Sequence, residues 1–193
     1  MAKKTRNTRG RIVSSAWKLF YEQGYEDTTV EEIIEQSHTS KGSFYHYFDG
    51  KDALLSTLSL LFDEKYEELR DTLDPDAPAM QQLLTLNAEL FGMIENSISM
   101  ELLARLLSTQ LTTSGEKHLL DHSRVYYKLL RAIIAKGQEK GELTARMSVS
   151  EMVKLYALSE RALMYDWCLC GGEYSLKAYA AQVLPAFLSA MNA

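Results

Sequence analysis

The sequence holds few of the residues that break helices or cross-link chains. Its 193 residues include three prolines, ten glycines and two cysteines. So few prolines and glycines exclude a collagen-like chain and argue against a disordered or turn-rich all-β protein. Two cysteines are too few for a disulfide framework or a complete zinc site, and they favour a reducing, cytoplasmic compartment. The composition therefore predicts a mostly helical protein.

Long hydrophobic runs and catalytic signatures are also missing. No apolar run approaches the roughly 18–20 residues of a membrane span. The basic start MAKKTRNTRGR is not followed by the apolar stretch of a signal peptide. Nucleophile elbows, phosphate-binding loops, dinucleotide fingerprints and zinc-protease motifs are absent. We therefore expect no membrane partner, no cofactor and no enzyme activity.

Two histidines form a weak metal motif. His118 and His122 lie four residues apart in EKHLLDH, a spacing that could hold a metal on one face of a helix. Asp121 would point to another side of that helix, and no third ligand can be placed. A solvated helix face is the better interpretation, and we predict no metal site.

Charge is unevenly distributed along the chain. The net charge is −5, yet the first 20 residues carry six lysines and arginines and no acidic residue. A basic segment on an acidic body suggests that one end meets a polyanion, although a solubilising tail has the same composition.

The first fifty residues predict three helices. The first carries apolar residues at helical spacing from Ile12 and ends near Gly24. The second opens with the capping box Thr29-x-x-Glu32 and ends near Ser37, and the third follows Ser40. The short turn between the last two helices is typical of a helix-turn-helix, here over about residues 29–48.

The third helix, KGSFYHYF, has two faces. The inward face is predicted from the spacing i, i+3, i+4 of Phe44, Tyr47 and Phe48. The outward face then carries Lys41, Gly42, Ser43, Tyr45 and His46. Their polar groups suit phosphates and base edges, and the glycine lets the backbone approach closely. Lys51, at the start of the next helix, is a further phosphate candidate.

Residues 9–62 resemble the DNA-binding domain of the tetracycline-repressor (TetR/AcrR) family of transcriptional regulators. The matching stretches are RIVSSAWKLFYEQGYEDTTVEEIIEQS and TSKGSFYHYFDGKDALL. The resemblance implies an all-α fold of about nine helices. It implies an N-terminal DNA-binding domain, here residues 1–50, and a C-terminal effector-binding and dimerisation domain, here residues 51–193. It further implies that phosphates are contacted by Thr29 and Lys51, and that the major groove is lined by Thr39, Ser40, Lys41, Gly42, Ser43, Tyr45 and His46.

Three positions depart from the family pattern. His38 stands at the usual glycine position of the turn, so it would take a positive φ at some cost. Thr39 keeps the shape of the usual valine and adds a hydroxyl. Gly50 replaces the usual capping serine, so Asp49 is expected to cap the next helix. We expect these departures to change turn stability or specificity without abolishing DNA binding.

The rest of the sequence predicts a series of helices. Residues 51–73 predict one long helix with a single buried side. The segment DPDAP at 74–78 is the clearest break. Further helices are expected at about 78–96, 99–110, 115–140, 148–170 and 174–191.

The C-terminal half is rich in methionine and aromatic residues. Such residues usually form plain core, but the family resemblance implies a cavity, and flexible or amphipathic side chains suit its lining. The candidate lining residues are Phe91, Met93, Met100, Tyr126, Tyr127, Arg161, Tyr165 and Trp167. Arg105, Glu160 and Arg161 are candidate polar anchors, although a dimer contact or a solvent-facing pair fits Glu160–Arg161 equally well.

The last two predicted helices carry more apolar surface than one small domain can bury. Residues 148–191 are therefore predicted to pack against a second chain in a four-helix bundle, with Leu184 and Leu188 as interface candidates. Cys168 and Cys170 point in different directions on a helix, and we expect them to serve core packing.

Together these features predict a sequence-specific transcriptional regulator. The expected protein is a homodimeric repressor that binds a palindromic operator in double-stranded DNA and is released by a small-molecule effector. The alternative is a helical small-molecule carrier or enzyme with an incidental N-terminal domain. A carrier requires neither the KGSFYHYF face nor the basic first segment.

Overall fold

The computed structural model describes residues 2–112 and 117–193, with side chains from Thr8 onward, so Lys3, Lys4 and Arg6 of the basic segment lie outside the described side chains. No described helix is long and apolar enough to cross a membrane. The described residues form α1 (Ala2–Gln23), α2 (Val30–Gln36), α3 (Lys41–Tyr47), α4 (Lys51–Leu55), α5 (Leu58–Thr72), α6 (Ala79–Ser97), α7 (Met100–Thr112), the 3₁₀ helix η1 (His118–Leu120), α8 (Val125–Glu139), α9 (Val149–Leu169), α10 (Leu176–Phe187) and the 3₁₀ helix η2 (Ser189–Met191).

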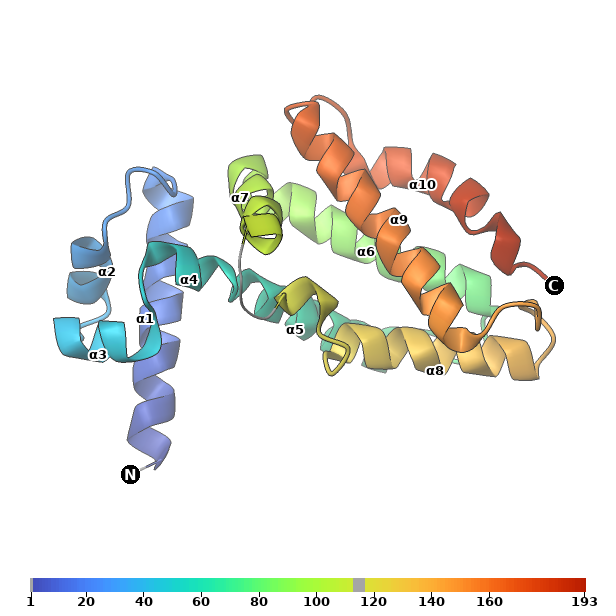
Figure 1. The fold of residues 1–193 in the computed structure, drawn as a ribbon, viewed down its shortest axis with the longest axis horizontal. Coiled ribbons are helices and arrows are strands. Elements are labelled where there is room, and N and C mark those ends of the chain that lie inside the picture. Colours follow the sequence, from blue (N-terminus) through green and yellow to red (C-terminus); the bar gives the residue numbers. More distant parts are fainter. Residues whose placement is uncertain (1, 113–116) are drawn as a thin grey trace.

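Helices α1, α2 and α3 form an N-terminal bundle, with α1 as its long axis (Figure 1). Ile12, Ala16 and Phe20 recur every four residues on α1 and are buried. Ile33 of α2 and Phe44 of α3 are buried as well, and α1 contacts both helices. The prediction of three N-terminal helices is therefore confirmed, although α1 starts well before Ile12 and includes the basic segment.

The predicted single helix over residues 51–73 is wrong, because the chain divides it into α4 and α5. The break lies at the buried residue Thr57. Its hydroxyl donates to the Leu54 carbonyl over 2.5 Å and accepts the indole N–H of Trp17 over 2.8 Å. Hydroxyls that bond the local backbone compete with the helical ladder. This division gives the described chain ten α-helices, where about nine were expected.

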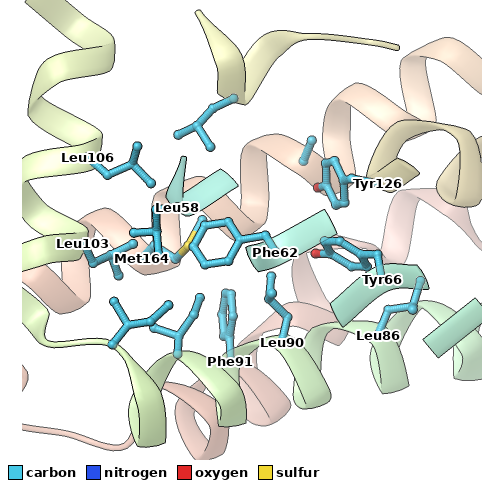
Figure 2. Close-up of a cluster of buried hydrophobic side chains, with 14 of the residues drawn as sticks. Leu58, Phe62, Tyr66, Leu86, Leu90, Phe91, Leu103, Leu106, Tyr126 and Met164 are labelled. Atoms are coloured by element: carbon cyan, nitrogen blue, oxygen red, sulfur yellow. The ribbon is translucent and has the colours of Figure 1, made fainter. Parts of the chain in front are cut away.

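The C-terminal domain is a bundle of longer helices. Figure 1 shows α10 beside α6, with α9 crossing them and α8 running along the lower edge. Helix α6 contacts α10 and α8, and α9 contacts α7, α8 and α10. Between α5, α6, α7 and α9 lies a continuous apolar cluster (Figure 2), which includes Leu58, Phe62, Leu90, Phe91, Leu103, Leu106 and Met164.

The helix boundaries depart most from expectation before α8. A helix over 115–140 was predicted, but η1 and a turn precede α8, and residues 113–116 lie outside the described residues. Asp121 accepts the backbone N–H of Ser123 over 2.8 Å, a local turn that separates η1 from α8. At the other end, α10 stops at Phe187, short of the expected 191, and η2 follows it.

Candidate DNA-binding face and ligand cavity

Helix α2 is anchored by the predicted capping box. The Thr29 backbone N–H donates to Glu32 Oε2 over 2.7 Å, and the Glu32 N–H donates to Thr29 Oγ1 over 3.2 Å. The Thr29 backbone N–H and the Thr29 hydroxyl both donate to the Glu32 carboxylate, and these two bonds hold the pKa of that carboxyl below its usual value. Thr29 is exposed at the start of α2. Its phosphate contact stays a prediction.

The turn between α2 and α3 has the expected geometry. His38 adopts φ 49°, the only positive φ of a non-glycine residue in the described chain. The predicted positive φ at this position is therefore confirmed. The hydroxyls of Ser37 and Thr39 lie 2.8 Å apart and join the two ends of the turn. Thr39 is consequently fixed beside α3, with its side chain partly exposed.

Helix α3 is capped and oriented as its sequence predicts. Ser40 Oγ accepts the backbone N–H of Ser43 over 3.1 Å. Phe44 and Phe48 are buried, whereas 46% of Tyr45 is exposed. The exposed residues of this helix, called the recognition face below, are Lys41, Gly42, Tyr45 and His46, while Ser43 is partly buried beside them.

The recognition face has the means to contact DNA without rearrangement of its core. A side chain at Gly42 would meet no atom within 4 Å, so this point of the backbone is open to a partner. The Lys41 ammonium lies 3.4 Å from Glu31, and both side chains are about 70% exposed. Exposed pairs of this kind contribute little to stability. A phosphate can therefore take the place of the carboxylate.

Lys51 is more constrained than expected. Its ammonium donates to the carbonyls of Tyr25 and Glu26 over 2.6 and 3.2 Å and lies 4.3 Å from the centre of the Tyr25 ring. A phosphate contact by Lys51 would compete with these bonds. The expected cap by Asp49 is wrong, since the residue at the N-cap of α4 is Gly50 and no side chain caps the helix.

A cluster of charged and aromatic side chains, called the junction below, links the N-terminal bundle to α7. Arg105 pairs with Glu26 in the loop after α1, and its guanidinium carbon lies 4.8 Å from the centre of the Tyr25 ring. The Tyr25 hydroxyl donates to Asp52 on α4. Burial and this carboxylate raise the pKa of Tyr25. Arg105 therefore belongs to the junction and does not anchor a ligand cavity.

The C-terminal domain contains a small cavity of about 30 Å³ between α5, α6, α8 and α9. Of the predicted lining residues, Tyr126 and Arg161 lie on its wall. Tyr127 is not part of the lining, but its hydroxyl accepts a hydrogen bond of 3.5 Å from the lining residue Arg161. The full lining is Phe62, Tyr66, Leu90, Leu119, Arg124, Tyr126, Ala157, Glu160, Arg161 and Met164.

The other predicted lining residues lie elsewhere. Phe91 is part of the apolar cluster of Figure 2. The Trp167 indole N–H donates to the Tyr174 carbonyl over 2.8 Å at the end of α9. Met100 and Trp167 both lie beside Gly172. Met93 packs on the core, and Tyr165 is about half exposed. The sequence contained no signal that Tyr66 or Leu90 would face a cavity.

Glu160 lies inside the domain, which excludes a solvent-facing pair with Arg161. It is 2% exposed and accepts the amide of Asn87 over 2.9 Å and the hydroxyl of Tyr126 over 2.7 Å. Burial outweighs these hydrogen bonds and raises the pKa of the Glu160 carboxyl. Its isolation in an apolar helix was the sequence signal for this polar site.

The two histidines do not share a helix face. His118 lies in η1, whereas His122 lies in the following turn and stacks on Tyr127 with ring centres 4.4 Å apart. No three potential metal ligands come together among the described side chains.

The two cysteines differ in their surroundings. Cys168 is half-buried, and burial raises the pKa of its thiol to about 11. Cys170 is exposed, so its expected role in core packing is wrong.

Helices α9 and α10 expose apolar side chains that nothing in the described chain covers. On α9 they form an apolar stripe of Leu158, Ala162, Tyr165 and Leu169. On α10 the exposed large side chains are Tyr179 and Phe187. Leu184 and Leu188 are instead fully buried within the chain, so their choice as interface residues is wrong. They face inward because α10 packs along α6.

Comparison with known proteins agrees with this architecture. A sequence profile described as "Bacterial regulatory proteins, tetR family" matches residues 12–58. The fatty acid metabolism regulator protein of Bacillus subtilis (strain 168) is 21% identical over 186 residues, which cover 94% of each chain. The HTH-type transcriptional repressor AcnR of Corynebacterium efficiens is 28% identical over 157 residues, 78% of this chain and 76% of the relative.

A solved structure extends the likeness to the whole fold. Thermus thermophilus FadR, a TetR family transcriptional repressor crystallised in complex with lauroyl-CoA, matches with a TM-score of 0.76 at 24% identity. The match covers 96% of this chain and 95% of that one. The helix-turn-helix geometry, the matched profile and the shared architecture lead to one conclusion: residues 12–58 form a DNA-binding domain of the tetR family of bacterial regulatory proteins, on a chain whose whole fold is similar to that of a TetR family repressor.

Proposed function

We propose that this chain is a homodimeric transcriptional repressor, released from a palindromic operator by a small-molecule effector. The observation that carries the proposal is the recognition face of α3. Its polar side chains are exposed while Phe44, in the middle of the same helix, is completely buried. We assign residues 1–50 to DNA binding and residues 51–193 to regulation and dimerisation. The protein acts in the cytoplasm and carries no catalytic activity.

In this proposal α3 enters the major groove. Tyr45 and His46 meet base edges, where hydrogen bonds and apolar contacts discriminate sequence. Thr29, Lys41 and the start of α3 contact the flanking phosphates, which fix register without reading sequence. Thr39, Ser40 and Ser43 line the walls of the groove beside them.

A second copy of the chain covers the exposed apolar residues of α9 and α10. Two α9–α10 pairs make a four-helix bundle, a common way for helices to bury such surfaces. Twofold symmetry then places two α3 helices on one side of the dimer. Half-sites about one turn of DNA apart match such a pair.

The effector enters the cavity beside Tyr126 and Arg161. The cavity is too small for a drug-sized ligand as it stands. Ligand entry therefore has to move the surrounding helices. An effector that prefers the moved state lowers operator affinity by the same factor by which operator lowers effector affinity. The relative with bound lauroyl-CoA supports an effector with a long apolar part.

The test is binding of the full chain to the DNA upstream of its own gene. Fluorescence anisotropy with this DNA and with a shuffled duplex of equal length measures specificity, and sedimentation measures stoichiometry. We expect two chains per duplex and an affinity for the upstream DNA at least about a thousandfold above that for the shuffled DNA. Equal affinity for both duplexes would refute sequence-specific regulation.

A further inference from the structure

We propose that the effector carries an acyl head, either a carboxylate or a thioester carbonyl, which the Tyr66 hydroxyl and the Arg161 guanidinium receive in the cavity. This inference rests on the proposed function and specifies the chemistry of its effector. It follows from the polar groups of the cavity wall, taken in turn.

Tyr66 offers a hydrogen-bonding group that the protein does not use. The residue is 2% exposed, and its hydroxyl is the one buried side-chain polar atom of the described chain without a hydrogen-bond partner. Figure 2 shows this hydroxyl on the side of the ring that faces Phe62, within the lining of the cavity. Buried hydroxyls are nearly always bonded in native proteins. A ligand oxygen in the cavity would supply the missing partner.

The neighbouring polar groups are already occupied. The Glu160 carboxylate accepts hydrogen bonds from the Asn87 amide and the Tyr126 hydroxyl. The hydroxyl proton of Tyr126 is therefore also committed to a bond within the protein. Arg124 forms two bonds of 3.0 Å with the Asp63 carboxylate. These side chains form the wall of the cavity without offering their charges to a ligand.

Arg161 is the exception among the charged groups. Within the described residues its guanidinium has one hydrogen bond, of 3.5 Å to the Tyr127 hydroxyl, and no carboxylate within 4 Å. The adjacent Glu160 is directed to Asn87 and Tyr126 and is buried. A guanidinium in this state favours carboxylate or carbonyl oxygens. It disfavours a cationic ligand.

The rest of the lining suits an apolar body. Phe62, Leu90 and Met164 lie on the cavity wall and continue into the cluster that includes Leu103 and Leu106 of α7 (Figure 2). A space of about 30 Å³ has room for little more than one water molecule. An alkyl chain must therefore displace these side chains, and the flexible Met164 is best suited to move.

Isothermal titration of the full chain with three probes whose chains have the same number of carbon atoms tests the head-group chemistry. The probes are laurate, lauroyl-CoA and dodecylamine. We expect laurate or lauroyl-CoA to bind at least tenfold more tightly than dodecylamine. Preference for laurate identifies the free acid as the source of the acyl head, and preference for lauroyl-CoA identifies the thioester. Equal or tighter binding of dodecylamine, or binding of no probe, would overturn the inference.

Matched variants test the two named residues. Tyr66→Phe should weaken binding of the preferred acyl probe by about tenfold, which corresponds to the loss of one hydrogen bond of about 1.4 kcal/mol. It should not lower the melting temperature, since its hydroxyl has no protein partner. Tyr156→Phe is the control, because that buried hydroxyl donates to the Leu83 carbonyl over 2.9 Å. This control should lower the melting temperature and leave probe binding within twofold.

Arg161→Gln should weaken binding of the acyl probe at least tenfold. It should also narrow the difference in affinity between the acyl probe and dodecylamine. If Tyr66→Phe and Tyr156→Phe bind the probe alike, or if Arg161→Gln keeps the full preference for the acyl head, the assignment is wrong. Operator binding is measured separately without ligand. Operator binding without acyl binding refutes only this inference, whereas acyl binding without operator binding refutes only the proposed function.

Discussion

Phe44 and Tyr45 are neighbours on α3 with opposite surroundings. Phe44 is completely buried, and Tyr45 is half exposed on the recognition face. Phe44→Ala should cost about 3–5 kcal/mol of stability, as for other truncated core aromatics. Tyr45→Ala should leave stability nearly unchanged and cost about 1–3 kcal/mol of operator binding. Thermal melts and operator titrations of both variants check this, and an exchange of the two phenotypes would mean that α3 faces the other way.

Two lysines near the recognition face should respond differently to removal. Lys41 is exposed, so Lys41→Ala should make the slope of log K against log salt shallower by about 0.9. Lys51 already donates to two carbonyls, so Lys51→Ala should lower the melting temperature. Operator titrations at several salt concentrations measure both slopes. If Lys51→Ala changes the slope as much as Lys41→Ala does, its ammonium turns to phosphate in the complex.

Glu160 should make stability depend on pH in a defined direction. Burial raises its pKa in the folded state above the unfolded value. The contribution of such a carboxyl is fully present below the unfolded pKa and is lost as pH rises through the folded pKa. Glu160→Gln cannot ionise, so its melting temperature relative to the parent chain should be higher at pH 8 than at pH 5. A difference that is constant across this range would mean that Glu160 stays charged when folded.

At the scale of single elements, the proposed dimer depends on α9 and α10. Leu158 and Leu169 belong to the exposed apolar stripe of α9, whereas Leu184 is buried against the chain's own core. Leu158→Glu with Leu169→Glu should give a folded monomer in light scattering. Leu184→Glu should instead unfold the domain, because it places a charge in the core. A double variant that remains a folded dimer would locate the interface elsewhere.

Local sequence patterns predicted the features that depend on residues close together in the sequence. The capping residues of α2 and α3 lie three residues from their partners, and the buried position of Phe44 follows from helical spacing. The break at Thr57 was missed because it involves Trp17, forty residues away. In α10, both faces are apolar, so spacing could not tell which one meets α6. Most of the cavity lining was missed for a similar reason: no pattern shows which buried tyrosine lacks a partner.

At the scale of the whole molecule, Arg105 should set the orientation of the N-terminal bundle. Its bond to Glu26 crosses from α7 to the bundle, whereas its bond to Glu101, of 3.2 Å, stays within α7. The measurement uses a chain in which both cysteines are replaced by serine and a spin label is placed at the exposed Tyr21. In the dimer of this chain, Arg105→Gln should broaden the distribution of distances between the two labels. The melting temperature should change little, since surface ion pairs contribute about 0–1 kcal/mol.

Glu101→Gln is the matched control for this measurement, because it removes the pair within α7 and keeps the one that crosses. Its distance distribution should match that of the parent chain, and Glu26→Gln should reproduce the broadening. Equal broadening by Glu101→Gln and Arg105→Gln would mean that the crossing bond has no special role.

The junction also limits how such a regulator can be recombined. Trp17 bonds to Thr57, and the loop after α1 is held by Lys51 and Arg105, so the first fifty residues complete their contacts with groups from beyond residue 50. A chimaera that joins a foreign bundle at residue 50 would lose these matched partners. A graft that carries α4, the start of α5 and the Arg105 surface of α7 with the bundle would keep them. Exchange of DNA-binding heads between regulators of this build therefore has to move a surface that is discontinuous in the gene.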